Sequence, residues 1–418
     1  MVPSALQRLS RDGWLLFATR FIRLFAYGSL SVVLVLYLIG VGLTEPEAGL
    51  VLTLTLAGDT VVSLYLTTRA DRLGRRRMLM IGALLMTAAG VVFASTTSLW
   101  LLVAAGIIGV ISPSGQEVGP FLPIEQAALS HVVTDRTRTD VFAWYTLAGA
   151  LATAFGALAA GTVTRTLQAR AWDTVSGYRT VVIVYAAFGV LLAVLFSRLS
   201  RTAEAETLGE KRALSSPLAA LSGVDESRQV VLKLSSLFAL DAFGGGFVVQ
   251  SLAAYWFHLR WGVDAGTLGG IFFWANVLAG ISALLASRLA ARIGLVTTMV
   301  VTHLPSNVLL ILVPLMPTLP LAIAVLLIRF SISQMDVPTR QSYLMAVVSP
   351  SERSAAAGIA GVARTTGASI SPLFVGAMFA RPWLMNVPFY IAGTLKIAYD
   401  LLLFGSFRRL KPPEEGER

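Results

Sequence analysis

The sequence predicts an all-α, polytopic membrane protein with twelve transmembrane helices in two six-helix bundles, both termini being cytoplasmic. Three observations lead to this fold class. Of the 418 residues, 56% are hydrophobic and only 13% are charged, whereas soluble chains are about 25% charged. The apolar residues gather in runs long enough to cross a hydrocarbon core of about 30 Å as helices. The two halves of the chain also repeat one another.

The apolar runs are expected to be helices, because a helix satisfies its own backbone hydrogen bonds in lipid. The first run follows a polar start without a small-residue cleavage site, so it is interpreted as a span and not as a signal peptide. The expected spans are residues 14–40, 47–68, 78–96, 99–130, 141–163, 180–198, 231–257, 267–287, 295–316, 319–347, 355–380 and 384–405.

The longest polar break divides the chain into six spans and six spans. We therefore expect an N-terminal six-helix bundle in residues 1–198, a cytoplasmic linker in residues 199–230 and a C-terminal six-helix bundle in residues 231–418.

The net charge of +10 is explained by topology. Most Lys and Arg residues fall in the connections on the side of the N-terminus, and cytoplasmic loops retain such residues. Nucleic-acid binding is therefore not expected, and the plasma (inner) membrane is the expected location. The chain has no cysteine, and its three histidines lack metal-ligand spacing, so neither a metal nor a cofactor is expected. A nucleotide-binding loop is missing too, which argues against ATP as the energy source.

The halves match most clearly around spans four and ten. Six residues of the stretch from Pro123 to Arg138 recur in the stretch from Pro338 to Arg353 at a constant offset of 215 residues. Span four also contains helix breakers from Pro113 to Pro123, and span ten has Pro338 at the matching place. Breaks at corresponding positions of two repeats are the best sequence indication of a transport site.

The connection between spans two and three, Asp71-Arg72-Leu73-Gly74-Arg75-Arg76-Arg77, resembles the loop motif of the major facilitator superfamily. The leading glycine of that motif is Thr67 here. The resemblance covers essentially the whole chain and implies the major facilitator fold and transport by alternating access. It also implies a cytoplasmic gate that includes Asp71, Arg72, Gly74, Arg75 and Arg76. Simple topology determination by positive charge is an equal alternative for the arginine run.

Charged side chains inside the spans are the candidate site, since ionisable groups in hydrocarbon normally face a cavity or a partner. In the family that the chain resembles, spans one, four, seven and ten line the central cavity. A purely structural salt-bridge network remains the alternative to substrate or proton handling. The candidate cavity residues are Arg20, Arg23, Tyr27, Glu117, Glu125, Asp241, Arg329, Asp336 and Arg340. Asp241 is the first choice for a protonation site.

Two further pairs of charged residues receive separate predictions. Asp59 in span two and Arg364 in span eleven are expected to pair as part of the cytoplasmic gate. Lys396 in span twelve stands four residues before an acidic residue, Asp400, so these two are expected to neutralise each other as a structural pair.

These features together predict a secondary active transporter that moves a small solute by alternating access, proton-coupled and with export favoured over uptake. Four cavity arginines suit an anionic or zwitterionic substrate, because guanidinium binds carboxylate or phosphate bidentately. The alternative is a transporter-like receptor or sensor without net transport. An enzyme is not expected, since His131 near Asp135 is the one hint of a catalytic group. The expected partners are the substrate, protons and the lipid bilayer, and the expected state is a monomer.

Overall fold

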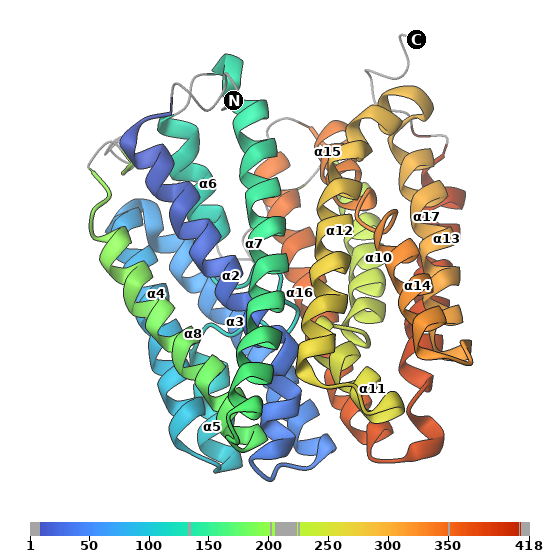
Figure 1. Ribbon diagram of the computed structural model, residues 1–418. Helices are drawn as coiled ribbons and strands as arrows, with labels where there is room; N and C mark the ends of the chain where they lie inside the picture. The colour runs from blue at the N-terminus through green and yellow to red at the C-terminus, as the bar shows by residue number, and fades with distance from the viewer. Residues whose placement is uncertain are drawn as a thin grey trace. The chain divides into compact units, whose positions relative to one another are not determined.

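The computed structural model describes residues 9–132, 135–200, 203–204, 224, 226–349, 352–408 and 410. Throughout these ranges the regular structure is helical, and no β-strand is found there (Figure 1). The side chains of residues 71–72 and 130–140 lie outside the described part.

In the N-terminal half, seven helices lie within the described residues. Several begin at residues that satisfy free backbone N–H groups: Thr44 and Glu47 form a capping box at the start of the second helix, and Asp173 caps the last helix. The helices are α2 (Arg11–Gly40), α3 (Glu45–Leu73), α4 (Arg75–Ser95), α5 (Leu99–Ile108), α6 (Phe121–Val132), α7 (Asp135–Ala169) and α8 (Thr174–Phe196).

In the described part of the C-terminal half there are eight helices and two short 3₁₀ turns. The 3₁₀ turns are Val313–Leu315 and Pro382–Leu384. The helices are α10 (Arg228–Gly246), α11 (Gln250–Trp261), α12 (Ala265–Ile293), α13 (Leu295–Leu312), α14 (Leu319–Phe330), α15 (Asp336–Val347), α16 (Arg353–Phe379) and α17 (Val387–Phe407).

Each of the twelve predicted spans contains helix, and three of them consist of two helices. Span four is α5 and α6 with residues 109–120 unwound between them, and span ten is α14 and α15 around residues 331–335. Span seven is also interrupted, at residues 247–249, which the sequence analysis did not predict. In the described ranges, nine helical segments are long and apolar enough to cross a membrane, and α5 and α14 are shorter apolar helices. The number of twelve spans and the cytoplasmic termini stay predictions.

Two compact units are found in the structure. The first comprises Met1–Lys211 and Val249–Asn276, and the second comprises Arg212–Val248 and Val277–Arg418. The predicted division at residues 199–230 stays a prediction.

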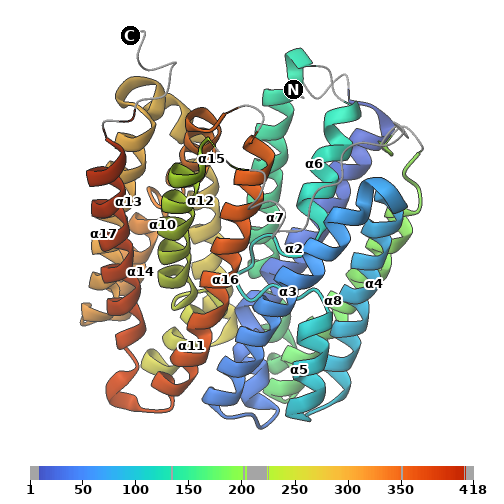
Figure 2. The ribbon, with the colours of Figure 1, turned by 180° about the vertical axis from the view of Figure 1, so that it is seen from behind.

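The same helix pairs recur within both units. In the first unit α2 packs against α7 and α8, and α4 packs against α8 (Figure 2). In the second unit the corresponding helices pair alike: α10 packs against α16 and α17, and α13 packs against α17. The repeat seen in the sequence is thus also a repeat of packing.

Candidate functional site

A buried ion-pair network occupies the first unit and is centred on Arg23 in α2. Its guanidinium contacts both oxygens of Glu125 in α6, with Nη1 2.6 Å from Oε1 and Nη2 2.7 Å from Oε2. Both side chains are fully buried. Glu117, in the unwound segment of span four, lies 3.1 Å from Arg23 and 2.7 Å from Arg20. We call these four residues the Arg23 network.

Neutral groups complete the hydrogen bonds of Glu125. The Tyr145 hydroxyl in α7 donates to Oε2 at 2.5 Å, and the Thr19 hydroxyl donates to Oε1 at 3.1 Å. The Arg20 guanidinium lies 4.3 Å from the ring centre of Tyr145. Two arginines and two glutamates therefore balance in charge, as buried ions require.

The unwound segment, residues 109–120, leaves backbone carbonyl groups without helical partners, and neighbouring groups supply the donors. The Tyr27 hydroxyl of α2 donates to Val118 O at 3.4 Å, and the Ser63 hydroxyl of α3 donates to Gly119 O at 2.9 Å. The Tyr185 hydroxyl donates to Val110 O, and the Thr153 hydroxyl donates to Gly115 O. The Ser112 hydroxyl donates to Gln116 O, and the backbone N–H of Ser251 donates to Pro113 O. Non-helical backbone is tolerated at membrane depth under such conditions.

A second buried network lies in the second unit and is centred on Asp241 in α10. Lys396 in α17 places its Nζ 2.6 Å from Oδ1, and Arg340 in α15 places its Nη1 2.9 Å from Oδ2. The same Arg340 nitrogen is 3.4 Å from Asp336 Oδ2. We call Asp241, Asp336, Arg340 and Lys396 the Asp241 network. All four side chains are buried.

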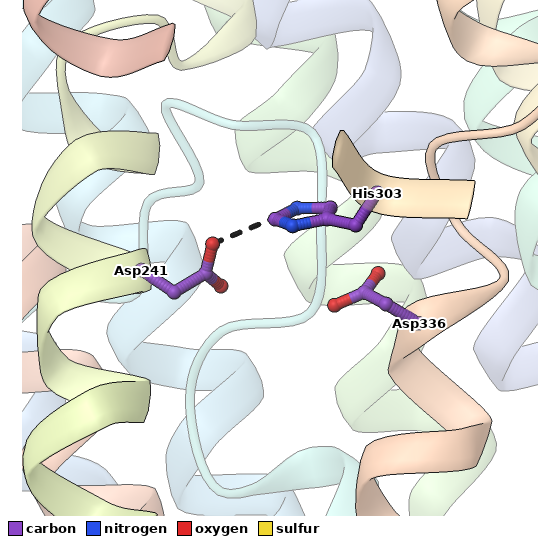
Figure 3. Close-up of side chains that lie close together, drawn as sticks. All are labelled: Asp241, His303 and Asp336. Atoms are coloured by element: carbon purple, nitrogen blue, oxygen red, sulfur yellow. Dashed lines mark ion pairs between the residues drawn. The ribbon is translucent and has the colours of Figure 1, made fainter. Parts of the chain in front are cut away.

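His303 of α13 extends this network toward Asp400. Figure 3 shows the His303 ring between Asp241 and Asp336, and its Nε2 is 3.6 Å from Asp241 Oδ1. The other ring nitrogen, Nδ1, lies 2.8 Å from Asp400 Oδ1, and Asn307 donates to Asp400 Oδ2 at 2.9 Å. His303 and Asn307 were not predicted from the sequence as members of the site. Their spacing of four residues places both on one face of α13.

Asp241, His303 and Asp336 are close enough together to hold a metal ion. Each carboxylate, however, already contacts a cation, namely Lys396 and Arg340 for Asp241 and Arg340 for Asp336. A metal ion would have to displace these cations, so we interpret the group as an ion-pair network.

Two residues of the second unit, Lys396 and Arg329, were singled out in the sequence, and the structure shows the contacts of both. The expected pairing of Lys396 with Asp400 is wrong, because Lys396 binds Asp241 and Asp400 binds His303. α17 packs against both α10 and α13. The four-residue spacing of Lys396 and Asp400 along α17 therefore did not determine their ion-pair partners. Arg329 is half-buried over the ring of Phe330 and has no ion-pair partner in the described part of the chain.

The predicted gate residues lie in both units. Gly74 adopts a φ of +100°, a conformation that favours glycine, and the Glu204 carboxylate accepts hydrogen bonds from the N–H groups of Arg75 and Arg76. This acidic residue caps the start of α4. The side chains of Asp71 and Arg72 lie outside the described residues.

A separate set of contacts joins residues 249–276 to the rest of the first unit. Gln250 donates to the Ser31 hydroxyl at 2.8 Å, and the Tyr255 hydroxyl donates to Glu45 at 3.0 Å. Arg165 binds Asp264 at 3.2 Å. Partial burial of Asp264 raises its pKa, but hydrogen bonds from Arg165 and Thr267 outweigh that effect and lower the pKa to about 2.

Comparison with known proteins identifies the family of this chain. The sequence profile of the Major Facilitator Superfamily matches residues 16–335. An uncharacterized membrane protein of Saccharomyces cerevisiae, YJR124C, is 32% identical over 422 residues, covering 94% of this chain and 93% of the yeast protein.

Solved structures agree with the fold. A D-xylose-proton symporter superimposes with a TM-score of 0.72 at 17% identity, covering 97% of this chain and 98% of the symporter. A bacterial homolog of the human lysosomal transporter Spinster, in an inward-facing and unoccupied conformation, gives a TM-score of 0.68 at 15% identity, covering 96% and 95% of the two chains. At these identities the likeness concerns the fold alone.

Proposed function

Since this chain belongs to the Major Facilitator Superfamily and is an integral, multi-pass membrane transporter, we propose that it is a secondary active transporter driven by protons. It moves a small anionic or zwitterionic solute by alternating access, with export favoured, and works as a monomer in the plasma membrane. The observation that carries this proposal is one buried, charge-balanced network in each unit, next to an interrupted helix. A ligand that competes for these ion pairs could be bound without leaving an unpaired charge.

An unpaired arginine supports an anionic group on the substrate. Arg329 has no ion-pair partner among the described residues, and it lies within electrostatic range of Asp241 and Asp336. An anion would pair with guanidinium groups that are not already neutralised. The proposed binding residues are the predicted cavity set, Arg20, Arg23, Tyr27, Glu117, Glu125, Asp241, Arg329, Asp336 and Arg340.

A thermal-shift screen of purified protein against organic anions, zwitterions and cations tests this proposal. An anionic or zwitterionic compound should raise the unfolding temperature of the wild type and should do so less in Arg340→Ala and Asp241→Asn. Lys233→Met, which changes an exposed residue of α10, is the matched control and should keep the full shift. A compound that stabilises all four proteins equally would remove the cavity assignment.

The gate assignment is a separate proposal. Asp59 and Arg364 pair in it as opposite charges, so Asp59→Arg and Arg364→Asp should each reduce solute counterflow, an exchange that needs no proton gradient, and their combination should restore it. Failure of the charge exchange to restore counterflow contradicts the pairing.

A further inference from the structure

Asp59 in α3 differs from the other carboxylates buried in the spans. It is 6% exposed, and its Oδ1 has no hydrogen-bond partner. No cation pairs with it among the residues that the structure describes. By contrast, Glu117 and Glu125 bind arginines, Asp241 and Asp336 bind Arg340, and Asp400 binds His303. A buried carboxylate without a partner is costly, and taking up a proton removes that cost.

The surroundings of Asp59 offer dipoles and no countercharge. The backbone N–H of Gly119, in the unwound segment, lies within hydrogen-bonding reach of the carboxylate. Two neutral phenols interact with it, Tyr27 from α2 and Tyr185 from α8. Arg23, the nearest cation of α2 to Tyr27 along the chain, is bound by Glu117 and Glu125.

The remaining helices packed against α3 add no free charge near Asp59. α5 contains no ionisable residue, and α4 has arginines only at its first three positions. The ionisable residue of α6 within the described side chains, Glu125, binds Arg23. Next to Asp59, α3 packs closely against α5, because a Cβ atom added at Gly58 would lie only 2.2 Å from Ile107 O of α5.

The site suits a proton better than a metal cation. A cation such as Mg²⁺ or Ca²⁺ needs about six or more oxygen ligands. The nearby carbonyl groups of Val118 and Gly119 already accept hydrogen bonds from Tyr27 and Ser63. A proton requires only the unpartnered Oδ1.

We propose that Asp59 is the residue that takes up and releases the coupling proton, an inference that rests on the proposed proton-driven transport. The proton adds to Oδ1 of the carboxylate and leaves a neutral carboxylic acid. Loss of the negative charge weakens the attraction to the Gly119 N–H, since charged acceptors bind more strongly than neutral ones. Gly119 follows Glu117 by two residues, so a change at Asp59 reaches the segment that holds Arg20 and Arg23.

Infrared difference spectroscopy of the purified protein tests the proposal without a substrate. On acidification, the wild type should gain the C=O stretch of a buried carboxylic acid. Asp59→Asn should lose this band, Asp59→Glu should keep it at a shifted frequency, and the exposed control Asp264→Asn should keep it unchanged. Asparagine matches aspartate in shape, and equal elution on size exclusion verifies that the variant is folded.

Two results overturn the inference: a wild type without the band, and an Asp59→Asn variant that keeps it. The second result is also expected if Asp59 serves only as an ion-pair partner of Arg364. Failure of the proposed function would give a different result. The protein would then show the Asp59-dependent band and carry no solute, which means that Asp59 binds a proton but the chain does not transport.

Discussion

Nζ of Lys396 lies 2.6 Å from Oδ1 of Asp241, although the two residues are 155 positions apart in the sequence. Both side chains are buried, and Arg340 holds the other carboxylate oxygen. Asp241 thus carries two strong cationic contacts, which stabilise its charged form and make it a less suitable proton acceptor than Asp59. We accordingly propose that the Asp241 network binds substrate and that Asp59 binds the proton.

The first prediction concerns this pair. Removing either partner of a buried ion pair typically costs about 3–5 kcal/mol, because the other charge stays buried and unpaired. Lys396→Met and Asp241→Asn should therefore each lower the unfolding temperature of the detergent-purified protein. The double variant should be more stable than the sum of the two losses implies. Strict additivity would mean that the two residues do not interact, and Lys233→Met on the exposed face of α10 is the control for removing a lysine.

A second prediction concerns Tyr145, which donates to Glu125 at 2.5 Å. Hydrogen bonds to charged groups contribute about 1.5–3 kcal/mol. Tyr145→Phe should lower the unfolding temperature by several degrees, because Glu125 loses a donor in a fully buried place. Tyr65→Phe, at a residue that is 57% exposed, should have no such effect. Equal melting of both variants would show that the Tyr145 hydroxyl is not needed by the network.

The third prediction is a pH dependence at Asp264. Its pKa is lowered from the ordinary value of 3.8 to about 2 by Arg165 and Thr267 against the effect of burial. A depressed pKa contributes stability above the unfolded value, and this contribution disappears as the pH falls from about 4 to about 2. Because Asp264 is partly exposed, the contribution belongs to the range of surface pairs, about 0.2–1 kcal/mol.

The measurement for this prediction is the unfolding temperature of wild type and Asp264→Asn across that acidic range. The difference between the two proteins should shrink toward zero as the pH falls. A difference that stays constant to the acid end would place the pKa of Asp264 outside the stated window.

A fourth prediction concerns the crossing of α2 and α7. A Cβ atom at Gly156 would lie 2.0 Å from the Phe25 carbonyl oxygen, and backbone atoms there cannot move aside cheaply. Gly156→Ala should destabilise the protein by overpacking, an effect of about 1–3 kcal/mol. Gly270 has open space around its Cα, so Gly270→Ala should be tolerated, since alanine favours helix by about 1 kcal/mol over glycine. Similar behaviour of the two variants would contradict the close approach of these helices.

Much of the architecture could be predicted because the hydropathy pattern and the internal repeat each extend over many residues. The twelve apolar runs all contain helix, and the proline-rich stretch of span four is unwound as expected. The break in span seven was missed because Gly244, Gly245 and Gly246 did not stand out from the many glycines of membrane helices. After the break, α11 packs against α2 of the first unit.

Pairing within the site was harder to predict than its membership. Charges such as Arg23 and Asp241 are conspicuous in apolar runs, so they could be selected from the sequence. The partner of each charged residue depends on how the helices are rotated and packed. Lys396 binds Asp241 of α10 and does not bind Asp400, its neighbour on α17. Uncharged members such as Tyr145 and Thr19 carry no signal of their own, since hydroxyl groups occur throughout membrane helices.

Counterflow in proteoliposomes tests the central claim, that this chain carries a solute and that residues of the two networks bind it. Vesicles loaded with an unlabelled ligand from the thermal-shift screen should transiently accumulate the labelled ligand from outside. Arg340→Ala and Asp241→Asn should reduce that accumulation strongly, while Lys233→Met should retain it. A wild type that binds the ligand but shows no counterflow would be a receptor or sensor and would contradict transport. Full counterflow in Arg340→Ala and Asp241→Asn would contradict the location of the site.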